Sequence, residues 1–215
     1  MSGKMSDSVF AMDDMRLMLE LPADWILPML NANDIACLAV LKNLYPVCYK
    51  LSGHDFFNYL TSEYLNTYPS SRYSIEGESF PDLIATLLPG KAGFLAELAS
   101  FEWAYSHASK NSFLLSTHFP VHQIWQMYQD EHSQKELHDF KMMLPNHRFY
   151  FLIWLNEEDM TVDVLSKDEW QILKWVRQRL SFTEIRENIN QLNIKIDIEN
   201  LLPYMSARGW LALAS

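Results

Sequence analysis

The fold of this chain is decided by three consecutive segments, Phe149-Tyr-Phe-Leu-Ile-Trp-Leu155, Asn156-Glu-Glu-Asp159 and Met160-Thr-Val-Asp-Val164. The first and third segments predict the strands of a β-hairpin, and the second supplies turn residues that tolerate tight or left-handed backbone. In the third segment the apolar residues share one face and alternate with Thr161 and Asp163, which is the period of a half-covered strand. We expect Asp163 to point outward. A small sheet with a free edge can accept another chain.

The composition is that of an ordinary folded protein with an acidic surface. The 215 residues are 49% hydrophobic and 20% charged, and the net charge is −10, from 17 basic and 27 acidic residues. From residue 148 onward there are 8 basic and 10 acidic residues, so the basic excess that phosphate neutralisation requires is missing from both halves. The charge therefore argues against nucleic-acid binding.

Two cysteines lie on one apolar helical stripe whose members are spaced four and three residues apart, namely Cys37, Leu41, Leu44, Cys48 and Leu51. This spacing predicts that both thiols are small, inert core groups, as expected in a reducing compartment. The sequence shows no signal-peptide layout and no apolar run long enough to span a bilayer. We expect a cytoplasmic protein that does not interact with membranes.

The chain up to residue 110 predicts a helical bundle. Asn33 or Asp34 is placed to cap the clearest amphipathic helix, Pro46 should kink or split that helix, and Gly53 should end it. Further helices are predicted over residues 13–21, 24–30, 54–68 and 80–88, and over the segment that contains Phe94, Leu98, Phe101 and Tyr105.

From residue 111 the pattern changes to strands followed by short helices. A first strand is predicted over residues 113–117, then a helix through Ile124, Trp125 and Tyr128, then the hairpin. Ser166 with Glu169, and Ser181 with Glu184, have the spacing of reciprocal capping boxes and predict two further helices. The second of these should bury Phe182, Ile185, Ile189 and Leu192. A last helix is predicted over residues 198–208, with a delayed start because Pro203 lies inside it.

These elements predict a mainly α fold with a small antiparallel sheet (α+β). We expect an N-terminal helical bundle over residues 1–110 and a C-terminal winged-helix-like module over residues 111–215. A winged-helix module can place a helix-turn-helix on DNA as a transcriptional regulator, or it can bind peptides. The sequence pattern alone does not separate the two functions, although the acidic charge favours the second.

Three blocks in the first half carry a family resemblance: Tyr45-Pro-Val-Cys-Tyr-Lys-Leu-Ser-Gly53 with Phe56-Phe57, Gly77-Glu-Ser-Phe-Pro-Asp82, and Leu95-Ala-Glu-Leu-Ala-Ser-Phe-Glu-Trp-Ala104. In this order they resemble the HvfC/BufC-type family, long described as DNA-binding. The sequence departs from the family pattern at Trp154, where a basic residue is expected on the second strand.

The C-terminal third resembles a RiPP recognition element, the winged-helix module of PqqD-type peptide chaperones. The matching segments are Val164-Leu-Ser-Lys-Asp-Glu-Trp170, Phe182-Thr-Glu-Ile185, Leu201-Leu202 and Gly209-Trp-Leu211. This resemblance implies a non-catalytic subunit of a heterodimer with a TIM-barrel, multinuclear iron-dependent oxidative enzyme. Such a subunit captures the leader of a ribosomally made precursor peptide whose cysteines the enzyme oxidises, and the iron belongs to the enzyme. Within this group the length is most similar to the partner proteins of methanobactin (copper-chelating peptide) biosynthesis.

In physical terms, we expect the leader to add a strand beside Met160–Val164 and to place apolar side chains near the last helix. The candidate peptide-binding residues are Met160, Thr161, Val162, Asp163, Val164, Leu201, Tyr204, Met205 and Arg208. The alternative is that the apolar members of this set only form the core. Asp163 could guard the edge against aggregation or orient a basic leader.

Other chemistry has less support in the sequence. His118 and His122 have the helical i, i+4 spacing, but Pro120 lies between them and no further ligand has a recognised spacing, so we expect no metal and no cofactor in this chain. No nucleophile motif occurs, and we expect no catalytic residue. We expect Glu102, beside Trp103, to be a partly exposed helix residue rather than a buried acid of altered pKa.

Overall fold

The computed structural model describes residues 8–11, 32–69, 76–88, 93–129, 141–144, 148–192, 194 and 196–211. They form two compact units, the first from the described residues of Met1–Ser106 and His118–His147, the second from those of His107–Thr117 and Arg148–Ser215. This division differs from the predicted boundary at residue 110. The reason is that the helix over residues 121–129, which follows the strand predicted over residues 113–117, packs with the bundle. The helices predicted over residues 13–21 and 24–30 lie outside the described residues.

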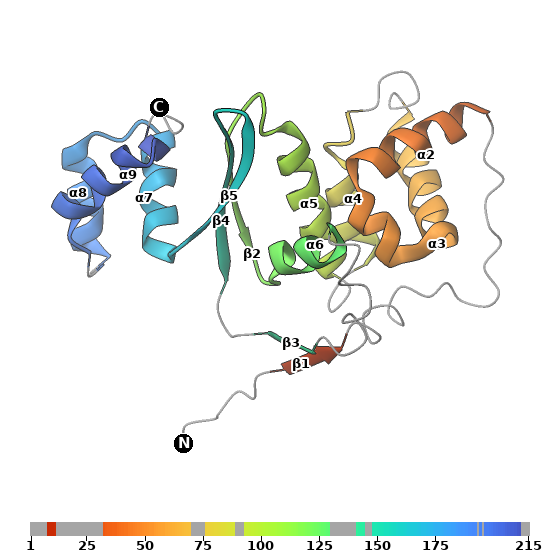
Figure 1. The fold of residues 1–215 in the computed structure, drawn as a ribbon, viewed down its shortest axis with the longest axis horizontal. Coiled ribbons are helices and arrows are strands. Elements are labelled where there is room, and N and C mark those ends of the chain that lie inside the picture. The colour runs from red at the N-terminus through yellow and green to blue at the C-terminus, as the bar shows by residue number, and fades with distance from the viewer. Residues whose placement is uncertain are drawn as a thin grey trace. The chain divides into compact units, whose positions relative to one another are not determined.

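The first unit is mainly helical and is drawn in orange to green in Figure 1. Its helices are α2 (Ala32–Leu44), α3 (Pro46–Thr67), α4 (Phe80–Leu87), α5 (Phe94–His107) and α6 (Val121–Gln129). In its core the aromatic ring of Phe80 contacts the rings of both Tyr45 and Phe57. A two-stranded antiparallel sheet of β1 (Ser8–Ala11) and β3 (Lys141–Leu144) was not predicted, because four-residue strands show too little periodicity.

Both predicted interruptions of the long helical stripe are present. α2 ends at Leu44, and Pro46 begins α3, where its missing N–H costs little. Gly53 has φ 77° and ψ 168° inside α3, so the chain kinks there and continues as a second helical segment. Cys37 and Cys48 form no disulfide and are 1% and 0% exposed, which confirms them as core residues.

The second unit contains a three-stranded antiparallel sheet of order β2-β4-β5, with β2 (Phe113–Thr117), β4 (Phe149–Asn156) and β5 (Asp159–Leu165). The predicted hairpin is confirmed, and its two-residue loop places Glu157 at φ 57°. Among the described residues β4 is the central strand and β5 pairs with β4 alone, so β5 lies at an edge. Together with the helices, this sheet confirms the α+β fold class.

Three short helices follow the sheet, α7 (Lys167–Arg177), α8 (Phe182–Gln191) and α9 (Ile198–Ala207), drawn in blue in Figure 1. Both predicted capping boxes are present, with Ser166 and Ser181 as the N-cap residues. The delayed start predicted for the last helix is wrong. Its N-cap is Asp197, whose carboxylate accepts two backbone N–H groups, and α9 accommodates Pro203.

The core of the second unit lies between the helices and one face of the sheet. Its buried members are Leu152, Leu165, Ile172, Leu173, Trp175, Ile185, Ile189, Ile198, Met205 and Trp210. The predicted core face of α8 is therefore too wide, since Phe182 and Leu192 are 48% and 62% exposed. These two residues lie at the ends of α8, and the two central isoleucines form the contact. Among the described residues, no helix has the length and apolarity needed to cross a membrane.

Candidate functional site

The edge of β5 presents backbone groups at every second residue. The loop of two residues pairs Asn156 with Asp159, and the pair that flanks such a loop exchanges both of its hydrogen bonds. The residues that bond to β4 are therefore Asp159, Thr161, Asp163 and Leu165. The residues whose N–H and C=O groups point away from β4 are Met160, Val162 and Val164.

The side chains of β5 also divide between two faces. Thr161 and Asp163 share a face with Leu165, which is 5% exposed and belongs to the core under the helices. Val164 lies on the opposite face and is 59% exposed. The expectation that Asp163 points outward is therefore wrong. The register places its side chain on the helix side of the sheet, and 16% of that side chain is exposed.

Asp163 is the centre of a polar cluster that joins β4, β5 and the end of α9. Its Oδ2 accepts hydrogen bonds from the indole Nε1 of Trp154 at 2.8 Å and of Trp210 at 2.9 Å. Its Oδ1 lies 3.4 Å from Nη1 of Arg208. Three donors thus compensate the partial burial of this carboxylate, which would be costly without them.

Trp154 supplies an uncharged donor to this cluster. This residue stands where a basic side chain was expected, and its indole N–H supplies a hydrogen bond to Asp163. The donor at this position therefore carries no positive charge. The positive charge beside Asp163 comes from Arg208, the residue that follows α9.

The four candidate residues on and after α9 differ in accessibility. Met205 is fully buried in the core, so it cannot contact a peptide on this surface, and Leu201 is partly buried against the same core. Tyr204 is 43% exposed, and the Arg208 side chain is 49% exposed. The guanidinium of Arg208 lies 5.1 Å from the Tyr204 ring centroid and 5.3 Å from that of Trp210. The most exposed candidate side chains are therefore those of Val164, Tyr204 and Arg208, and the outward backbone groups of β5 are candidate contacts as well.

Replacing Asp163 with asparagine should destabilise the protein by about 1–2 kcal/mol, because one carboxylate oxygen and the ion pair with Arg208 are lost while both indoles still need an acceptor. Urea unfolding followed by tryptophan fluorescence measures this change. The matched control is Asp159→Asn, an exposed residue of the same strand, which should leave the midpoint unchanged. Equal stability of the Asp163→Asn variant and the parent would contradict the role assigned to this carboxylate.

A second polar centre lies in the first unit, where Glu102 on α5 caps the start of α3. Its carboxylate accepts the backbone N–H of Val47 at 2.7 Å and of Cys48 at 3.0 Å. Glu102 is 2% exposed, so the expectation of a partly exposed residue is wrong. Burial raises its pKa from 4.5 to about 7, although the two backbone hydrogen bonds act in the opposite direction. Sequence periodicity does place Glu102 on α5, but it does not show the two N–H groups that it serves.

The same buried region disfavours a reactive thiol. Burial and the neighbouring Glu102 both raise the pKa of Cys48 well above its usual range. The thiolate, which is the nucleophilic form, is therefore disfavoured. Cys48 acts here as a core residue of α3.

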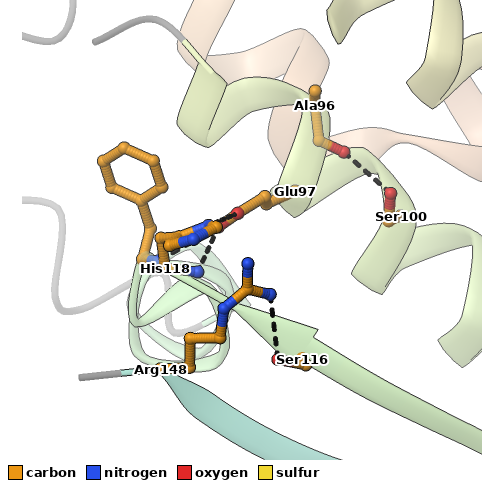
Figure 2. A network of polar contacts seen from close by, with 7 residues as sticks. Ala96, Glu97, Ser100, Ser116, His118 and Arg148 are labelled. Carbon is orange, nitrogen blue, oxygen red and sulfur yellow. Dashed lines mark hydrogen bonds and ion pairs between the residues drawn. The ribbon is translucent and has the colours of Figure 1, made fainter. Parts of the chain in front are cut away.

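Figure 2 shows Glu97 of α5, which holds the chain just before α6. Its carboxylate accepts the backbone N–H groups of His118 at 2.8 Å and Phe119 at 3.0 Å, and also Nδ1–H of His118 at 2.8 Å. His118 is therefore engaged with Glu97. Within the part of the chain that the structure describes, no three His, Cys, Asp or Glu side chains are grouped to hold a metal ion. In the second unit, Arg148, just before β4, donates a hydrogen bond to the hydroxyl of Ser116 on the neighbouring strand β2.

The described residues define an α+β protein in which an edge strand lies beside a helix end that carries aromatic rings and an exposed cation. Comparisons with protein-family models, curated proteins and solved structures gave no match. The likeness to the HvfC/BufC-type family and to RiPP recognition elements thus stays a prediction from the quoted motifs.

Proposed function

We propose that this chain is a non-catalytic partner subunit that binds an extended peptide as an added strand along β5. The observation that supports this proposal is the edge itself, because β5 pairs with β4 alone among the described residues. Every second residue of β5 directs its N–H and C=O groups away from β4, and these groups can pair with an incoming strand.

The surroundings of the edge suit a peptide. Beside β5 lie Tyr204, in the last turn of α9, and Arg208, just after that helix, and both can contact the side chains of an added strand. An aromatic ring and an arginine are the residue types most often found as strong contacts in protein interfaces. Val164, exposed on the other face of the sheet, offers an apolar contact for the alternate residues of the same peptide.

The motif resemblance narrows this general function to a particular one. The bound peptide is the leader of a ribosomally synthesised precursor, and the chain presents the precursor's cysteines to a TIM-barrel, multinuclear iron-dependent oxidative enzyme in a heterodimer. Within that group, the length of the chain looks most like that of the methanobactin biosynthesis protein MbnC. In this proposal the protein is cytoplasmic, the iron belongs to the enzyme, and this chain holds no cofactor and binds neither nucleic acid nor membrane.

The competing function, DNA recognition by a helix-turn-helix, is less well supported by the charges on α8. Its exposed residues Glu184 and Glu187 are acidic. Its arginine, Arg186, lies 3.8 Å from Glu199 of α9 and is thus partly neutralised. A helix that enters a DNA groove needs an excess of basic groups toward the phosphates.

Reconstitution tests the proposal. If the genes beside this one encode an iron-dependent barrel enzyme and a short cysteine-containing peptide, the purified chain should form a heterodimer with the enzyme and bind the leader half of the peptide. The enzyme alone should leave the peptide cysteines unmodified, as followed by mass spectrometry. An enzyme that is fully active alone, or an absence of binding to both molecules, would contradict the proposal. Salt-dependent, sequence-specific retention on DNA would favour the regulator instead.

A further inference from the structure

Arg208 lies against aromatic rings on the surface. Its guanidinium lies over Tyr204 and Trp210, whose rings meet edge to face with centroids 5.7 Å apart. Cation–π contacts of this kind restrict a side chain that would otherwise sample many rotamers. Since 49% of the side chain is exposed, the cation is also accessible to a ligand.

Arg208 is not the main partner of Asp163. The two indole N–H groups reach Asp163 Oδ2 at 2.8 and 2.9 Å, whereas Nη1 of Arg208 lies 3.4 Å from Oδ1, which is long for a charge-assisted hydrogen bond. A guanidinium carries five N–H donors in a planar fork. Asp163 therefore occupies only part of the donor capacity of Arg208, and a second carboxylate can bind to the same fork.

The register of β5 brings this fork next to one position of an added strand. A residue opposite Asp163 would direct its side chain to the same face as Asp163, because directly opposed residues in a sheet share a face. Such side chains lie about 5 Å apart at Cβ. A carboxylate at that position would reach Arg208, whereas a lysine there would meet the guanidinium and be repelled.

The charges at the hairpin end of β5 make one position along the strand unfavourable for an acidic residue of the peptide. The hairpin loop and its flank carry three exposed acids, Glu157, Glu158 and Asp159. Asp159 shares a face with Asp163 and lies four residues, about 13 Å, away along the strand. A peptide acid is thus favoured opposite Asp163 and disfavoured opposite Asp159.

We propose that the peptide bound along β5 carries an aspartate or glutamate opposite Asp163, and that Arg208 binds its carboxylate. This inference rests on the proposed strand addition and names the side chain that the site selects. It reverses the sequence-based idea that Asp163 orients a basic leader, because the indoles and Arg208 already compensate that carboxylate.

A random display library of peptides about ten residues long, enough to cover a strand, tests the inference on the full chain. Selection on the parent should enrich peptides with Asp or Glu at one fixed position. Selection on Arg208→Glu should enrich Lys or Arg at that position, and selection on Arg208→Gln should remove the preference. The matched control Arg186→Gln, an exposed arginine of α8, should select the same peptides as the parent.

Binding measurements with synthetic versions of the selected peptides give the size of the preference for an acidic residue. The parent should bind the glutamate peptide about tenfold more tightly than its glutamine counterpart, as one charge-assisted contact implies, and Arg208→Gln should lose this preference for glutamate. If Arg208→Glu does not fold, as judged by circular dichroism, the affinities of Arg208→Gln for the two peptides test the role of Arg208. Binders without an acidic position, or with a basic one there, would overturn the inference while leaving strand addition intact. Failure to select any binder would overturn both.

Discussion

Replacing Val162 with proline should lower the affinity of the chain for its peptide at least tenfold while leaving the fold intact. Val162 directs its N–H away from β4, so the substitution removes no hydrogen bond of the hairpin, and proline is tolerated at such edge positions. The added strand would lose one backbone hydrogen bond, worth about 1 kcal/mol, and would meet the pyrrolidine ring. Isothermal titration with a peptide selected from the display library measures the change.

Two further variants separate strand addition from loss of structure. Val162→Ala keeps the N–H and should bind within a few-fold of the parent, which assigns the proline effect to the backbone. Asp163→Pro removes an N–H that bonds to β4 and should unfold the hairpin, as expected for proline within a ladder. If Val162→Pro binds the peptide as tightly as the parent, the peptide does not lie along β5.

Replacing Glu102 with glutamine should make the stability of the protein less dependent on pH. The folded pKa of Glu102 is raised from 4.5 to about 7, so the folded state binds a proton more tightly than the unfolded state. The stabilisation from that proton is complete below pH 4.5 and is lost as the pH rises through 7. The shift corresponds to about 3 kcal/mol between acidic and alkaline conditions.

Urea unfolding of both proteins at pH 5 and pH 8 measures this effect. The stability of the parent relative to Glu102→Gln should fall by about 2.5 kcal/mol between the two conditions, because the acids common to both proteins cancel in the comparison. Glu102→Ala is the control for the cap. It leaves the N–H groups of Val47 and Cys48 without their acceptor and should be destabilised at both pH values. Parallel pH profiles for the parent and Glu102→Gln would show that Glu102 does not hold the proton.

Local patterns in the sequence predicted most of the elements. The alternation in Met160–Val164, the capping boxes at Ser166 and Ser181, and the breaks at Pro46 and Gly53 all depend on residues close together in the chain. Each is a short-range effect of backbone geometry or side-chain hydrogen bonding, so sequence spacing is sufficient to place it. The paired four-residue strands β1 and β3 carry too little pattern to be recognised.

The polar centres were not predictable in the same way, because their partners are distant in sequence. Asp163 meets Arg208 and Trp210, which are 45 and 47 residues further on, and Glu102 meets backbone groups more than 50 residues before it. Period-two alternation divides the residues of a strand between two faces but does not say which face the helices cover. Asp163 was placed on the wrong side for that reason.

Amide hydrogen exchange of the full chain, resolved by residue with NMR and compared with and without a library-selected peptide, tests strand addition most directly. We expect peptide binding to protect the N–H groups of Met160, Val162 and Val164, which point away from β4. Those of Thr161 and Asp163 bond to β4 already and should change little. New protection confined to α8, with the exchange of β5 unchanged, would contradict strand addition along β5.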